Sequence, residues 1–254
     1  MKKTSSPSLS KITKKGKALF LAYDQGFEHG PSHDFNDKNI DPLYVLDVAK
    51  RGKYTGIVFH KGIAEKYKNE IKKSKVPLII KLNGKTKLFN GEPLSVQICT
   101  INEAISLGAK AVGYTIYIGS KYESRMLDEF ADIQRQAHKK RIPVISWVYP
   151  RGKAIKNPDS RENLAYSARI ALETGADIAK IHYNGKLEDL KWAVKSAGRC
   201  KIVIAGGIKT NEKALLKNVK EIMQAGAIGL AIGRNVWQNK NPLEITKKIK
   251  KIIF

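Results

Sequence analysis

Ile202-Val203-Ile204-Ala205-Gly206-Gly207 and Ile228-Gly229-Leu230-Ala231-Ile232-Gly233-Arg234-Asn235 are two apolar runs that lead into glycine and are separated by a segment of helical length. Glycines let backbone N–H groups approach a phosphate closely, and a helix that begins there adds a favourable dipole. Barrels of parallel strands often bind phosphate at the loops after their last two strands. Tight turns are the alternative explanation of these glycines. The residues that we expect to bind an anion are Gly206, Gly207, Gly233 and Arg234.

The same pattern, a short apolar run followed by a helical segment, recurs along the chain. Between the runs, apolar residues recur at helical spacing, as in Leu127, Phe130 and Ile133. Alternating strands and helices favour a parallel sheet. The eight runs that we expect to be strands are residues 18–23, 56–59, 78–82, 111–116, 144–149, 177–182, 202–205 and 228–232.

Eight parallel strands could form either a barrel or an open doubly wound sheet. A dinucleotide-binding open sheet usually has a G-x-G-x-x-G turn after its first strand, and the chain has none there. Its 254 residues are the usual length of one barrel, and no low-complexity linker divides them. We therefore predict the α/β class and one (β/α)8 TIM-barrel domain over residues 1–254, with residues 1–16 as a flexible basic arm.

Composition restricts the location and the partners. No apolar run could span a bilayer, and the basic N-terminus lacks the apolar stretch of a secretory signal, so we expect a cytoplasmic protein. Cys99 and Cys200 have no metal-ligand spacing and are expected to be reduced thiols. The net charge of +24 could attract nucleic acid or anionic substrates. Because the lysines are scattered, we interpret them as a solvated surface and nucleic-acid binding as the weaker alternative.

Lys180 lies in the middle of the apolar run 177–182. A period of two places it on one face with Ile178 and His182. Neither face of a barrel strand offers an ammonium group bulk water, and desolvation lowers the pKa of a lysine. A neutral amine can attack a carbonyl to form a Schiff base. A lysine that pairs with a buried acid or reaches the surface is the alternative.

Strand 144–149 supplies aromatic partners for this lysine. Trp147 and Tyr149 share a face, and we expect Tyr149 to lie beside Lys180 on the neighbouring strand. A phenol near an iminium can move a proton at carbon, and Arg151 could hold a second phosphate with two hydrogen bonds. An aromatic core layer with a surface arginine is the alternative.

The loop after the first strand is rich in polar residues. Asp24 at the strand end is the candidate carboxylate, which could accept a proton from a substrate hydroxyl or orient the sugar. Lys81 ends the third strand, where we favour charge complementarity to the substrate over a second nucleophile. The residues that could instead bind a metal are Glu28, His29, His33 and Asp34, but their spacing matches no established site.

Several motifs in the same order resemble the archaeal-type class I fructose-bisphosphate aldolases, which belong to the DhnA-type barrel aldolases. The resemblance covers nearly the whole chain. The motifs are DQGFEHGP at 24–31, KLNGKT at 81–86, WVYPRG at 147–152, ADIAK at 176–180, AGG at 205–207 and GRNVWQ at 233–238. It implies that Lys180 forms the Schiff base, that Tyr149 donates and accepts the proton, and that Asp24 is an acid/base or orienting residue. The further residues expected to bind substrate or phosphate are Gln25, Glu28, His29, Lys81, Trp147 and Arg151.

The implied reaction is the reversible cleavage of fructose 1,6-bisphosphate into dihydroxyacetone phosphate and glyceraldehyde 3-phosphate in glycolysis and gluconeogenesis. This aldehyde-lyase chemistry needs neither metal nor cofactor, because the lysine imine is the electron sink. The resemblance also implies a homo-oligomer based on pentamers, such as a decamer.

Two alternatives stay open on the same scaffold. A transaldolase-type synthase that makes 2-amino-3,7-dideoxy-D-threo-hept-6-ulosonate, or another phosphosugar aldolase, would use the same lysine and tyrosine. The first-strand loop favours fructose bisphosphate. The segment 181–185 departs from the family pattern, with His182 and Asn184 where other residues are expected, and it bears on fine specificity.

Overall fold

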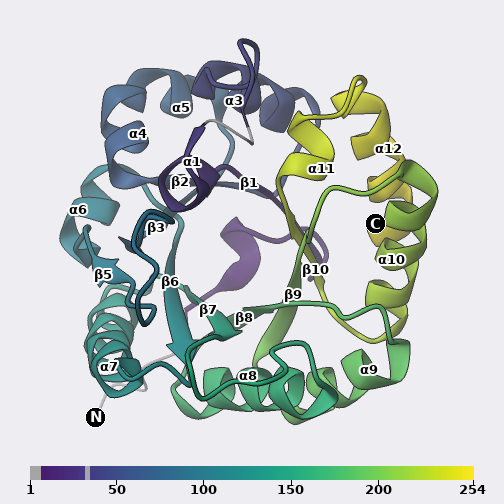
Figure 1. The fold of residues 1–254 in the computed structure, drawn as a ribbon. Helices are drawn as coiled ribbons and strands as arrows, with labels where there is room; N and C mark the ends of the chain where they lie inside the picture. Colours follow the sequence, from purple (N-terminus) through teal and green to yellow (C-terminus); the bar gives the residue numbers. More distant parts are fainter. Residues whose placement is uncertain (1–6, 32–34) are drawn as a thin grey trace.

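The computed structural model describes residues 7–31 and 35–254. Within them, eight parallel strands close into a barrel, and helices surround it (Figure 1). The (β/α)8 barrel predicted from the sequence is therefore confirmed. The barrel strands, in order around the ring, are β1 (Ala18–Ala22), β2 (Gly56–His60), β3 (Leu78–Lys81), β6 (Ala111–Ile118), β7 (Val144–Pro150), β8 (Ile178–Ile181), β9 (Lys201–Ala205) and β10 (Gly229–Ile232).

Helical segments connect the strands and form the outer layer (Figure 1). A short antiparallel ribbon, β4 (Asn83–Gly84) with β5 (Val96–Gln97), follows β3 and has no clear signal in the sequence. The helices are η1 (Leu9–Lys11), α1 (Gln25–His29), α3 (Pro42–Arg51), α4 (Lys61–Lys66), α5 (Lys68–Ser74), α6 (Ile101–Ser106), α7 (Glu123–Lys139), α8 (Arg161–Glu173), α9 (Leu187–Ser196), α10 (Glu212–Gln224), α11 (Arg234–Trp237) and α12 (Pro242–Ile253).

Local sequence signals explain where the helices begin and end. Thr100 forms a capping box with Glu103 at the start of α6, which satisfies backbone N–H groups that have no partner within the helix. Gly108, Gly175 and Gly226 have φ angles of 88°, 82° and 93° just after α6, α8 and α10. Glycine adopts this left-handed conformation without steric cost, so these residues let the chain leave each helix.

The strand register decides which side chains point into the barrel. Residues paired across parallel strands face the same side, and Trp147 on β7 pairs with Lys180 on β8. Lys81 pairs with Gly113, the only residue type that fits there, because a Cβ at Gly113 would lie 1.8 Å from the Trp147 ring. The sequence of β6 thus leaves room for the indole beside the reactive lysine.

Part of the N-terminal arm packs against the barrel. Leu9–Lys11 forms η1, Ile12 is completely buried, and this segment lies behind the centre of the ring in Figure 1. Part of the segment 7–16 therefore packs against the barrel, and residues 1–6 lie outside the described part. Among the described helices, none is long and apolar enough to cross a membrane.

Candidate active site

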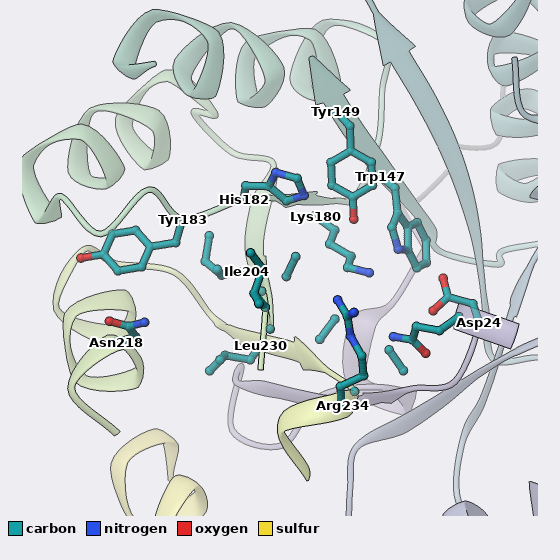
Figure 2. A pocket seen from close by; sticks show the side chains of 18 of the residues that line it. Asp24, Trp147, Tyr149, Lys180, His182, Tyr183, Ile204, Asn218, Leu230 and Arg234 are labelled. Carbon is teal, nitrogen blue, oxygen red and sulfur yellow. The ribbon is translucent and has the colours of Figure 1, made fainter. Parts of the chain in front are cut away.

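The carboxyl ends of the barrel strands surround a cavity of about 570 Å³ (Figure 2). Strands β1, β7, β8, β9 and β10 all contribute to it, so residues distant in sequence converge there. Every predicted site residue except Lys81 lines this cavity. They are Asp24, Gln25, Glu28, His29, Trp147, Tyr149, Arg151, Lys180, Gly206, Gly207, Gly233 and Arg234.

Lys180 projects from β8 into this cavity with only 6% of its surface exposed. Its Nζ atom lies 4.9 Å from the centre of the Trp147 ring. Burial lowers the pKa of the amine to about 8, the Asp24 carboxylate partly opposes this, and the Lys81 charge reinforces it. Compared with the usual lysine pKa of 10.5, the neutral fraction at pH 7 is roughly 300-fold larger. Lys180 is thus suited to attack a carbonyl.

This pKa predicts how Lys180 reacts with carbonyl compounds. We expect its reductive trapping by a phosphorylated aldehyde and borohydride to rise with pH and level off above about 8. Exposed lysines should continue to gain reactivity towards their usual pKa of about 10.4. Peptide mass mapping of samples trapped between pH 6 and 11 measures the reactivity of Lys180 and of the exposed lysines in one experiment. A midpoint for Lys180 at the value of the exposed lysines would contradict the effect of burial.

Lys81 lies beneath the cavity and is completely buried. Its Nζ atom is 3.4 Å from Asp24 Oδ2 and also contacts Glu28 Oε1. Burial alone would raise the pKa of the Asp24 carboxyl, but the charges of Lys81 and Lys180 lower it below its ordinary range. Asp24 is therefore ionised. Lys81 was expected to contact substrate, whereas in the structure it holds these two carboxylates at the floor of the site.

Tyr149 points its hydroxyl into the same space as the Lys180 amine (Figure 2). The pairing of β7 with β8 differs from the expectation. Trp147, not Tyr149, pairs with Lys180, and Tyr149 lies two residues further along β7, where its ring packs against His182. Burial, followed by the charges of Asp24 and Glu28, raises the pKa of the phenol well above 10. The hydroxyl is therefore protonated and able to donate a proton.

The two glycine loops lie side by side at one end of the cavity. Asn235 joins them, because its side-chain amide donates to Gly206 O at 2.8 Å and its Oδ1 accepts from Thr210 N at 2.9 Å. A Cβ at Gly233 would lie 2.9 Å from the backbone oxygen of Ala22, so glycine is needed for this close approach. Asn235 therefore holds the two loops next to each other at the cavity.

A second cavity of about 370 Å³ adjoins the first and is strongly basic. Arg151 and Arg234 line both cavities, and the second adds Lys85 and Lys87. The guanidinium of Arg151 lies 5.5 Å from the Tyr149 ring centre. The space beside the Lys180 amine is therefore lined by positive charge that suits an anionic substrate.

Some residues of the cavity escaped the sequence analysis. Tyr117 follows Thr115 by two residues on β6, so alternation along that strand could have predicted that its side chain points into the barrel. Asp159 comes from an irregular loop that has no periodic signal. Among the described residues, no group of three or more His, Cys, Asp or Glu side chains could hold a metal; His33 and Asp34 lie outside them.

Comparisons with known proteins agree with this geometry. The sequence model of the DeoC/LacD family aldolases matches residues 18–239. The class 1 fructose-bisphosphate aldolase of Thermoproteus tenax is 48% identical, over 96% of this chain and 92% of its own length. A fructose-bisphosphate aldolase/6-deoxy-5-ketofructose 1-phosphate synthase of Methanocaldococcus jannaschii is 34% identical, over 96% of this chain and 82% of its own.

Solved structures lead to the same group. The chain superposes with a TM-score of 0.92 and 47% identity, over 96% of its length and 97% of the other, on an archaeal fructose-1,6-bisphosphate aldolase. In that structure the catalytic lysine is covalently bound to the carbinolamine intermediate of the substrate. The chain belongs to the DeoC/LacD family of aldolases and, within it, to the archaeal-type class I fructose-bisphosphate aldolases.

Proposed function

We propose that this protein is a class I aldolase that reversibly cleaves fructose 1,6-bisphosphate into dihydroxyacetone phosphate and glyceraldehyde 3-phosphate. One observation supports it above the others. The buried amine of Lys180 lies in a cavity that the glycine loops, Arg234 and Arg151 also line, and the basic cavity with Lys85 and Lys87 adjoins it. A bisphosphate with its ketone between two anions matches this arrangement.

In the proposed mechanism, Lys180 attacks the C2 ketone, and loss of water gives a protonated imine. The C3–C4 bond then breaks as the C4 hydroxyl loses its proton, and the imine accepts the electron pair as an enamine. Tyr149 protonates this enamine at C3, and hydrolysis releases the second triose and restores Lys180. Asp24, ionised beside Lys81, orients the sugar hydroxyls by accepting hydrogen bonds.

We further propose that the reaction needs no metal or cofactor, because the imine supplies the electron sink. Glycolysis and gluconeogenesis in the cytoplasm fit a triose-phosphate product, and a pentamer-based homo-oligomer stays a prediction from the family. A second phosphosugar reaction is also open, since the M. jannaschii relative carries a synthase activity in its name. A 2-amino-3,7-dideoxy-D-threo-hept-6-ulosonate synthase would differ in the acceptor and not in the lysine.

The first experiment is incubation with fructose 1,6-bisphosphate and borohydride in EDTA, followed by intact mass and peptide mapping. Cleavage is assayed in parallel without borohydride. A triose-phosphate adduct on Lys180 together with cleavage in EDTA is the expected result. If neither adduct nor cleavage is found, the substrate assignment is wrong, and other phosphorylated sugars should be tested.

The second basic region should recognise the phosphate at C6. In the double variant Lys85→Ala/Lys87→Ala we expect KM for fructose 1,6-bisphosphate to rise roughly 10-fold or more, since charge-assisted hydrogen bonds are lost. The kcat/KM for fructose 1-phosphate, which lacks that phosphate, should change little. Lys191→Ala/Lys195→Ala on the exterior helix α9 removes the same charge and serves as the control. Equal losses of kcat/KM for the two sugars would contradict the assignment of Lys85 and Lys87 to the C6 phosphate.

A further inference from the structure

His182 and Asp159 form a hydrogen-bonded pair on the wall of the cavity. His182 follows Lys180 by two residues and lies one residue beyond the end of β8. Its Nδ1 atom lies 3.3 Å from Asp159 Oδ1, and both residues line the cavity. Within the described residues, Asp159 is the only hydrogen-bond partner of this ring. Its Nε2 atom therefore has no hydrogen-bond partner among the described residues.

The surroundings of His182 keep the ring neutral. Burial lowers the pKa of the imidazole, Asp159 partly opposes this, and the Arg151 and Lys180 charges lower it further. A neutral ring that donates Nδ1–H to a carboxylate has a lone pair on Nε2, and this atom can accept a proton. The ring also packs against Tyr149, with 4.6 Å between the two ring centres (Figure 2).

Asp24 and Tyr149 are poorly suited to accept a proton from substrate. Asp24 is ion-paired with Lys81, which lowers the pKa of its carboxyl. Tyr149 is a protonated phenol whose pKa is raised by burial. In the proposed pose, a bisphosphate is attached at Lys180 with its far end at Arg151, and His182 lines the cavity that holds both groups. The reacting C4 hydroxyl lies in this half of the substrate.

We propose that His182 is the base that accepts the C4 hydroxyl proton and that Asp159 is its positioning residue; the assignment rests on the proposed function. The proton moves from the C4 oxygen to Nε2, that oxygen forms the aldehyde C=O, and the C3–C4 electron pair moves into the enamine. Tyr149 then protonates C3, the phenolate regains a proton, and the imidazolium releases one. The C4 hydroxyl thus loses one proton and C3 gains one, and both side chains return to their starting protonation states.

Two reactions of the same enzyme separate this role from a structural one. Exchange of a C3 proton of dihydroxyacetone phosphate with deuterated water needs Lys180 and Tyr149 but no hydroxyl base. Cleavage of fructose 1,6-bisphosphate needs all three residues. For His182→Asn we expect the borohydride adduct and the exchange rate to be retained within about 3-fold, while cleavage falls roughly 100-fold, the usual effect of losing a general base.

The chain supplies a matched control. His138 and Asp177 form a second His–Asp pair, with Nε2 2.9 Å from Oδ2, at the opposite end of β8 and outside the cavity. His138→Asn should leave the ratio of cleavage to exchange unchanged. Asp159→Asn should lower this ratio in the same direction as His182→Asn, and it also tests the assignment if His182→Asn fails to fold.

The outcomes are distinguishable. An unchanged ratio in both site variants, or equal losses of exchange and cleavage, would overturn the role of His182 while wild-type cleavage upholds the proposed function. A wild-type chain that forms no adduct and cleaves nothing would overturn the proposed function and this role with it. The assignment is supported if His182→Asn and Asp159→Asn retain exchange and lose cleavage while His138→Asn retains both.

Discussion

Replacement of Lys180 by methionine is expected to abolish the borohydride adduct and to lower cleavage of fructose 1,6-bisphosphate by roughly 10⁴-fold or more. Methionine fills a similar volume in the buried position but has no amine, so the imine that accepts the electron pair cannot form. Folding should be preserved, since the variant removes a desolvated cation whose pKa is already lowered by burial. Intact mass, steady-state cleavage and thermal unfolding measure the three effects.

A matched control separates this effect from the loss of any strand lysine. Lys201 begins β9 at the opposite end of the barrel and is exposed, so Lys201→Met should keep both the adduct and the activity. An adduct that persists in Lys180→Met and maps to Lys81 would show that the nucleophile had been assigned to the wrong strand.

The fold could be predicted because its signals are local and repeated. Each strand reads as a short apolar run, and glycines such as Gly175 mark helix ends by a conformation that other residues avoid. The ribbon of β4 and β5 escaped prediction because two-residue strands have no measurable period. Burial of Ile12 was also missed, since nothing in a basic segment shows which residue packs beneath the barrel.

The sequence predicted which residues line the cavity, but not which of their side chains contact one another. Lys180 and Tyr149 were identified from alternation, yet which residue faces Lys180 depends on barrel register, which a sequence does not specify. The partners of Lys81 depend on how α1 folds back over β3, a contact across more than fifty residues. Asp159 comes from an irregular loop, where neither the helical nor the strand periodicity of side chains applies.

The buried charges at the floor of the site lead to the second large prediction. Lys81→Met leaves the Asp24 and Glu28 carboxylates without their buried cation. Breaking a buried ion pair on one side costs about 3–5 kcal/mol, so we expect a loss of this size in the free energy of unfolding. The pKa of Lys180 should also rise, because a like charge is removed. Denaturant unfolding and the pH dependence of borohydride trapping measure the two effects.

The loss should depend on pH with a definite sign. In the wild type the pKa of Asp24 is lowered by folding, so its contribution is present at neutral pH and lost as the pH falls through the carboxyl range. Without Lys81 this contribution is absent, so the deficit of Lys81→Met should be largest near pH 7 and shrink below about pH 4. Lys61→Met, which breaks a partly exposed surface pair with Glu103, should have little effect at either pH.

The triple variant Lys81→Met/Asp24→Asn/Glu28→Gln decides whether the cost is the unpaired charge or the lost packing. Removing these three charges together should recover much of the stability, because no carboxylate is then left without the Lys81 cation. Activity should stay low, since Asp24 no longer accepts hydrogen bonds as a carboxylate. A triple variant as unstable as Lys81→Met would show that the lysine stem stabilises the barrel floor by packing, and a stable Lys81→Met would show that water reaches the two carboxylates.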